Sequence, residues 1–258
     1  LLRAQQEAAN RALAAGVLDY DQRHGYRGPE ASVDLADDPE TRATQIADAL
    51  AERAPVNELL PAVVTSGSSR LLKAQLADGT ELTLDATSLK WVGQWAAAKP
   101  GRALRAGAVV RVLQRGQGWQ LAQLPEIEAA LIALDPNSGA ITALVGGFDF
   151  GKNKFNHVTQ AWRQPGSSFK PFIYSAALER GYTPATLVDD APITLAAEES
   201  GGEAWEPKNY DGSFHGPVRL RYALTNSLNL VSVRVLQDIG PHYARDYTRR
   251  FGFDPARH

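Results

Sequence analysis

The chain has 258 residues, of which 44% are hydrophobic and 22% charged, as in an ordinary globular protein with room for two domains. Its 27 basic and 29 acidic side chains leave a net charge of −2 without any basic run, which disfavours nucleic acid and anionic membrane surfaces as partners. The absence of cysteine excludes disulfides, thiol catalysis and cysteine-bound zinc.

Residues 1–57 are predicted to form a helical linker. Apolar residues at helical spacing indicate a helix over 1–15, with Gly16 in the left-handed position after its last turn. A second helix is expected to begin at Asp38, which can cap the helix N-terminus ahead of Pro39. The chain opens in the middle of a helical pattern and contains no methionine, so we expect a piece of a longer protein whose N-terminus holds any targeting segment.

Residues 58–125 are predicted to form a small β-barrel. Short runs of alternating polarity are separated by turn signals, of which Asp78-Gly79 is the clearest for a hairpin. This pattern is typical of an oligonucleotide/oligosaccharide-binding (OB) type of barrel. Its tryptophans, Trp91, Trp95 and Trp119, fit either a stacking platform for a ligand or, as is commoner, a place in the barrel core.

Residues 126–258 are predicted to combine a β-hairpin with helices, which makes the whole chain a multidomain α+β protein. The hairpin is expected from two apolar runs around Asp-Pro-Asn-Ser-Gly at 135–139, and near-continuous apolar runs are typical of strands covered on both faces. Helices are expected at about 168–180, 219–226, 229–239 and 241–251.

One candidate for chemistry lies at the predicted start of the helix at 168–180, in the string "PGSSFKPF". Ser167 and Lys170 are three residues apart, which brings their side chains to one helix face. A lysine that is partly buried near a helix N-terminus loses proton affinity, and a neutral Lys170 could activate Ser167 as a nucleophile. The alternative is a serine that only caps the helix beside a solvated lysine.

A second candidate is Ser227-Leu228-Asn229, at the predicted connection between two helices. Residues two apart in an extended or turn segment project to the same side, so the Ser227 hydroxyl could relay a proton while the Asn229 amide holds a substrate carbonyl. The alternative is that Ser227 or Asn229 caps the second helix.

Other polar residues carry less information. The histidines show no ligand spacing, so no metal site is predicted, and no cofactor is implied. The acidic pairs Asp37-Asp38 and Glu198-Glu199 are interpreted as solvated surface rather than acid/base pairs. Trp205 and Tyr210, in "AWEPKNYDG", could line a groove above Ser167, or Trp205 could serve in packing.

The order Ser-x-x-Lys followed by Ser-x-Asn resembles that of the penicillin-interacting acyltransferases. The strings "LIALDPNSGAITALVGG", "KFNHVTQAWRQPGSSFKPFIYSAAL", "AWEPKNYDG" and "GPVRLRYALTNSLNLVSVRVLQDIG" resemble the transpeptidase domain of class A penicillin-binding proteins of the 1a type. Residues 58–125 are similar to the OB-like barrel inserted in that family, and "YDQRHGYRGPE" to the linker after its glycosyltransferase domain. The resemblance therefore implies the first part of a transpeptidase domain with a serine β-lactamase-like α/β fold over 126–258.

The resemblance also implies roles for the motif residues. Ser167 would be the acylated nucleophile, Lys170 its base, Ser227 the proton relay to the leaving amine, and Asn229 the group that binds the donor peptide and orients Lys170. The implied reaction is the cross-linking of peptidoglycan stem peptides that end in D-Ala-D-Ala, which β-lactams block by mimicking the donor. The implied location is the bacterial periplasm, with an inner-membrane anchor in the missing N-terminal part, and the barrel is a possible docking site for cell-wall regulators.

The sequence departs from the family in one respect. The third family motif, Lys-Thr-Gly, is absent, and the nearest string is Lys99-Pro100-Gly101 in the barrel region. We therefore expect this chain to be inactive alone. Two alternatives stay open: a β-lactamase or β-lactam sensor with the same motifs, which would have no use for the barrel, and a non-catalytic interaction module.

Overall fold

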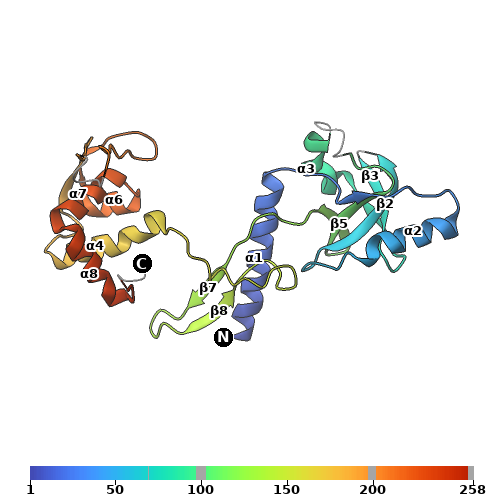
Figure 1. The fold of residues 1–258 in the computed structure, drawn as a ribbon, viewed down its shortest axis with the longest axis horizontal. Helices are drawn as coiled ribbons and strands as arrows, with labels where there is room; N and C mark the ends of the chain where they lie inside the picture. Colours follow the sequence, from blue (N-terminus) through green and yellow to red (C-terminus); the bar gives the residue numbers. More distant parts are fainter. Residues whose placement is uncertain (69, 97–102, 197–201, 255–258) are drawn as a thin grey trace. The chain divides into compact units, whose positions relative to one another are not determined.

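The computed structural model describes residues 1–68, 70–96, 103–196 and 202–254, and the chain divides into two units, Leu1–Trp162 and Arg163–His258 (Figure 1). Both units contain helices and antiparallel strands, which confirms the predicted α+β class. None of the described helices is both long enough and apolar enough to cross a membrane.

Helix α1 (Arg3–Arg23) is longer than the sequence predicted. The expectation that Gly16 ends it is wrong, since the helix continues for seven residues beyond this glycine. Leu13 and Val17 on either side of Gly16 are buried in one apolar cluster, and this packing outweighs the roughly 1 kcal/mol by which glycine disfavours a helix. The helix ends instead with His24 as its C-cap, followed by Gly25 at a φ of 99°.

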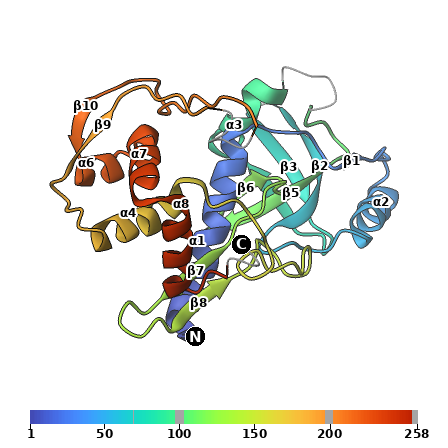
Figure 2. The same ribbon diagram turned by 60° about the vertical axis from the view of Figure 1, so that its left-hand side comes forward.

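Helix α2 (Pro39–Ala51) begins where the sequence predicted. The Asp38 carboxylate accepts a hydrogen bond from the Thr41 backbone N–H at 2.9 Å, and Pro39 occupies the first turn. This capping lowers the pKa of Asp38, since the backbone N–H of Thr41 favours the charged form. Ile46 and Leu50 of α2 pack on Val63 and Val109, next to the sheet (Figure 2).

Within residues 1–68, 70–96 and 103–122, the barrel is one antiparallel sheet of six strands. Its strands are β1 (Ala31–Ser32), β2 (Leu60–Ser68), β3 (Leu71–Gln75), β4 (Glu81–Leu84), β5 (Ala108–Arg115) and β6 (Gly118–Ala122). The sheet order is β1-β5-β2-β3-β4. Strand β6 also pairs with β5, further along that strand than β1 does. Because β4 also lies next to β6, the sheet curls around a core of apolar side chains. The hairpin predicted at Asp78-Gly79 is the β3–β4 connection.

Two features of the barrel were not predicted. Helix α3 (Ala86–Ala96) lies between β4 and β5, and the Asp85 carboxylate accepts from the Ser88 N–H at its start. Tyr26 and β1, from the stretch expected to be linker, contribute to the barrel core and sheet. Trp91 and Trp119 pack against that core, as the commoner alternative predicted, whereas the side chain of Trp95 lies outside the described part of the chain.

A β-hairpin, β7 (Leu131–Leu134) and β8 (Ile141–Val145), forms around the predicted turn. It packs beside α1 in the first unit, in a cluster that includes Leu131, Val145, Leu13 and Val17 (Figures 1 and 2). The expectation that both faces are covered is wrong for the described residues. The opposite face keeps three large side chains 44–53% exposed: Ile132, Leu134 and Ile141.

The N-terminal end of α1 also occupies the outer edge of β8. The Gln6 side-chain amide accepts from Leu144 N at 2.9 Å and donates to Leu144 O at 2.9 Å, while Leu2 N donates to Thr142 O at 2.7 Å. The backbone groups of β8 that face away from β7 thus find partners on a helix instead of a strand.

The second unit is a small group of helices with a two-stranded sheet. A 3-10 turn at Gly166–Phe169 leads into α4 (Lys170–Glu179), and β9 (Leu187–Asp190) pairs with β10 (Gly216–Arg219), an antiparallel strand pair that was not predicted. The helices described after β10 are α6 (Leu220–Thr225), α7 (Asn229–Ile239) and α8 (Pro241–Tyr247), the last extended by a 3-10 turn at Thr248–Phe251. Their apolar faces form one core around α4 and α7.

Candidate active site

Ser167 and Lys170 occupy the start of α4, as predicted. Ser167 lies in the 3-10 turn, Lys170 is the first α-helical residue, and the Lys170 N–H donates to the Ser167 carbonyl. Residues three apart eclipse in a 3-10 turn, which places both side chains on one side. The Ser167 residue is exposed, and its hydroxyl makes no hydrogen bond within the described residues.

Lys170 is buried, with 8% of its surface exposed, and this burial lowers the pKa of its ammonium group because the charged form is poorly solvated. Its Nζ donates to three oxygens, which are Ser227 O at 2.6 Å, Ser227 Oγ at 3.0 Å and Asn229 Oδ1 at 2.8 Å. An ammonium group has three hydrogens, so every one of them has an acceptor here. The solvated lysine of the alternative interpretation is therefore wrong.

Ser227 lies in the turn between α6 and α7, where the sequence placed a helix–helix connection. The turn is a Schellman motif, in which Leu228 N donates to Ala223 O at 2.9 Å and Ser227 N donates to Leu224 O at 3.1 Å. Ser227 takes the left-handed position, at a φ of 54°, that glycine usually fills in this motif. A side chain at this position is strained, and the strain points to a use for the hydroxyl.

Asn229 is the first residue of α7, and neither it nor Ser227 caps that helix. The N-cap residue is Leu228, whose side chain makes no capping hydrogen bond. Instead, Asn229 Oδ1 accepts from Lys170, and Asn229 Nδ2 donates to Lys208 O at 2.8 Å. The capping alternative for these two residues is therefore wrong, and the prediction that both face the same way is confirmed.

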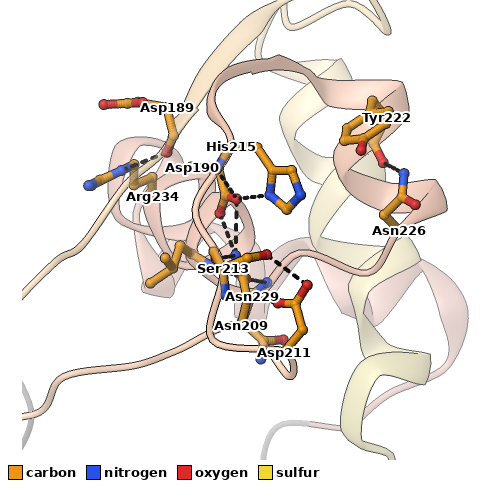
Figure 3. A network of polar contacts seen from close by, with 11 residues as sticks. Asp189, Asp190, Asn209, Asp211, Ser213, His215, Tyr222, Asn226, Asn229 and Arg234 are labelled. Carbon is orange, nitrogen blue, oxygen red and sulfur yellow. Dashed lines mark hydrogen bonds and ion pairs between the residues drawn. The ribbon is translucent and has the colours of Figure 1, made fainter.

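Asn209 and Asp190 were not identified from the sequence. Asn209 binds Asn229, and Asp190 in turn binds Asn209 (Figure 3). Asn209 Oδ1 accepts from Asn229 N at 2.8 Å, and its Nδ2 donates to the buried Asp190 carboxylate at 2.8 Å. Asp190 also accepts from the ring of His215 at 2.7 Å. The one signal in the sequence was the position of Asn209 in the string "AWEPKNYDG", between the two aromatic residues singled out there.

A cavity of about 760 Å³ opens beside these groups, within the range of small-molecule sites. Ser167, Lys170 and Asn229 line it, together with Trp205, Glu206 and Lys208 from the long segment between β9 and β10. Trp205 is half exposed on this cavity, while Tyr210 is fully exposed and does not line it. The arrangement offers a hydroxyl, a buried amine and an amide to one bound molecule.

Some sequence predictions fall elsewhere. Asp37 and Asp38 are exposed at the start of α2, as predicted. Lys99-Pro100-Gly101 and Glu198-Glu199 lie outside the described residues.

Comparison with protein families agrees with this description. Residues 26–127 match the penicillin-binding protein OB-like domain, and residues 129–257 match the penicillin binding protein transpeptidase domain. The chain therefore consists of an OB-like barrel followed by the sequence of a transpeptidase domain. It belongs to the penicillin-binding proteins.

Individual relatives give a finer comparison. The chain is similar to penicillin-binding protein 1A of Escherichia coli (strain K12), with 41% identity over 265 residues that cover 100% of this chain and 31% of the relative. Its likeness to penicillin-binding protein 1A of Neisseria lactamica is 42% identity, over 97% of this chain and 32% of that protein. The crystal structure of penicillin-binding protein 1A from Haemophilus influenzae superposes with a TM-score of 0.85 at 35% identity, covering 98% of this chain and 37% of that one. The chain thus spans about a third of the length of these relatives.

Proposed function

We propose that this chain carries the acylation site of a peptidoglycan D,D-transpeptidase, with Ser167 as nucleophile and Lys170 as its base. The observation that carries the proposal is the set of hydrogen bonds that holds Lys170 Nζ on Ser227 and Asn229, beside the exposed Ser167. A buried lysine with a lowered pKa can take the role that histidine has in other serine acyltransferases.

Each of these four residues has its own role in the proposed reaction. Ser167 Oγ attacks the carbonyl carbon of the penultimate D-Ala and transfers its proton to neutral Lys170. The proton then passes through the Ser227 hydroxyl, 3.0 Å from Nζ, to the nitrogen of the departing terminal D-Ala. Asn229 orients Lys170 through Oδ1 and, on the cavity side, the donor peptide. An amine of a second stem peptide next attacks the ester, and Ser167 recovers its proton as the cross-link forms.

The partners follow from the same chemistry. A β-lactam carries an amide that Ser167 can open, and the resulting ester stays attached, so β-lactams should label the site. For the whole protein we propose a periplasmic enzyme with an inner-membrane anchor and a glycosyltransferase domain, by likeness to its relatives. We further propose a barrel that is open to regulators, followed by transpeptidase sequence at 126–258; the barrel predicted at 58–125 also takes in Tyr26 and β1 from the stretch predicted as a linker at 1–57.

The test is labelling of the full-length protein with a fluorescent penicillin, followed by peptide mapping. Ser167→Ala should abolish labelling, while Ser168→Ala, an exposed neighbour outside the cavity, should leave it intact. Lys170→Arg should also abolish it, because a guanidinium stays protonated. In the unmodified protein the rate should rise with pH, with its midpoint below the ordinary lysine pKa of about 10.4. Labelling of Ser167→Ala at the normal rate would refute the nucleophile assignment and favour a non-catalytic module.

A further inference from the structure

The N-terminus of α7 is capped by a residue from another segment. Asn209, which is 5% exposed, lies in the connection between β9 and β10, and its Oδ1 accepts from Asn229 N at 2.8 Å and from Leu230 N at 3.4 Å. The first N–H groups of a helix have no partner inside the helix, and an asparagine oxygen is among the best acceptors for them. Asn209 thus fixes where α7 begins.

The same connection also holds the side chain of Asn229. Lys208 O accepts from Asn229 Nδ2 at 2.8 Å, so two consecutive residues bind Asn229: the Lys208 backbone carbonyl binds its side chain, and the Asn209 side chain binds its backbone N–H. The remaining amide atom, Asn229 Oδ1, is left to face Lys170 Nζ. The direction of this oxygen is therefore set by the position of residues 208 and 209.

A buried carboxylate sets the orientation of Asn209 in turn (Figure 3). Asn209 Nδ2 donates to both oxygens of Asp190, at 2.8 and 3.0 Å, and to Ser213 O at 2.9 Å. Asp190 is fully buried, and its carboxylate also accepts from His215 N at 3.1 Å and is bonded to His215 Nδ1 at 2.7 Å. Because a carboxylate only accepts, it holds the NH₂ end of the amide toward itself and the oxygen toward α7.

We propose that Asn209, oriented by Asp190, is a positioning residue for the acylation of Ser167. It acts through Asn229, whose Oδ1 it aims at Lys170. This inference rests on the proposed transpeptidase function and adds to it a second group of residues that never touches the reacting atoms. A misplacement of about 1 Å in a site of this kind can lower the rate about 10²-fold.

The test uses two-step acylation kinetics of the full-length protein with a chromogenic β-lactam. Asn209→Asp removes the amide donor and sets a second carboxylate against Asp190, so the charges repel. We expect the maximal acylation rate to fall by about 10²-fold, with a smaller change in the half-saturating β-lactam concentration, since no residue that lines the cavity is replaced. Asp190→Asn combined with Asn209→Asp exchanges the two groups and restores both the donor and the single charge. This double variant should recover about tenfold or more of the lost rate.

Tyr182→Phe is the matched control for stability. It removes the hydrogen bond from Tyr182 to Asp238 at the far end of α7, and should leave the acylation rate at the normal level. The inference is overturned if Asn209→Asp acylates at the normal rate, if the exchange recovers nothing although the protein is folded, or if Tyr182→Phe slows acylation as much. An unmodified protein that fails to acylate at Ser167 would refute the proposed function itself, whereas normal acylation in Asn209→Asp would refute only this inference.

Discussion

At the scale of single residues, Ser227 has an unfavourable backbone conformation and makes the contacts expected of a reactive group. Its positive φ completes the Schellman turn after α6, and its carbonyl and hydroxyl both face Lys170 Nζ. Glycine would satisfy the turn without strain but has no hydroxyl. The side chain is therefore best explained by its contact with the lysine.

Replacement of Ser227 separates these two effects. Ser227→Gly should be more stable than Ser227→Ala by about 1 kcal/mol in chemical denaturation, because only the alanine keeps a Cβ in the left-handed region. Both variants lose the hydroxyl, so both should be slower in acylation by about 10²-fold or more. Equal stability of the two variants would mean that the turn is unstrained, and normal acylation by the glycine variant would mean that the hydroxyl is dispensable.

At the scale of elements, the sequence was most informative where the apolar pattern is periodic. Helix α7 begins and ends at the predicted residues because Val231, Val235 and Ile239 repeat at helical spacing and share one core. The pattern was less informative for β9 and β10, which have four residues each. The contact of Asn209 with Asn229 bridges 20 residues of sequence, and local spacing carries no information on such contacts.

The join between β1 and β5 depends on a glycine. Gly107 has a φ of 87°, its N–H donates to Val64 O at 2.8 Å, and its carbonyl accepts from Val33 N at 2.9 Å. A Cβ added here would lie 1.9 Å from Val33 O, so the backbone would have to move. This glycine lets the segment around β1 close on the barrel.

We expect Gly107→Ala to lower the free energy of unfolding by about 3 kcal/mol, since it adds a backbone clash to a strained φ. Gly116→Ala is the matched control, because Gly116 also has a positive φ, of 59°, but has no atom within 4 Å of the added Cβ. The control should lose only about 1 kcal/mol in urea denaturation. Equal losses in the two variants would show that the close approach to Val33 is not important.

At the scale of the whole molecule, the hairpin presents an exposed apolar face. Ile132, Leu134 and Ile141 are adjacent on two paired strands and are all about half exposed. Contiguous exposed apolar patches promote association. The 258-residue chain on its own should therefore bind hydrophobic dyes and self-associate as its concentration rises.

The test is sedimentation of the chain over a range of concentrations. Replacing Ile132 and Leu134 together by lysine should reduce the association, because it places charges on the exposed face of β7. Leu71→Lys is the matched control, since Leu71 is 47% exposed on the barrel strand β3. Association that persists in the hairpin variant and disappears in the control would place the contact on the barrel instead.

The contact of Gln6 with Leu144 determines which edge of the β7–β8 sheet can accept a further strand. A glutamine amide has the same donor and acceptor as a peptide group, and here it pairs with the Leu144 N–H and carbonyl as a residue of a neighbouring strand would. Helix α1 thus occupies the outer edge of β8, where a further strand would otherwise pair. The outer edge of β7 has no partner among the described strands. Any polypeptide that lengthens this sheet must be added one way, from β7 outward.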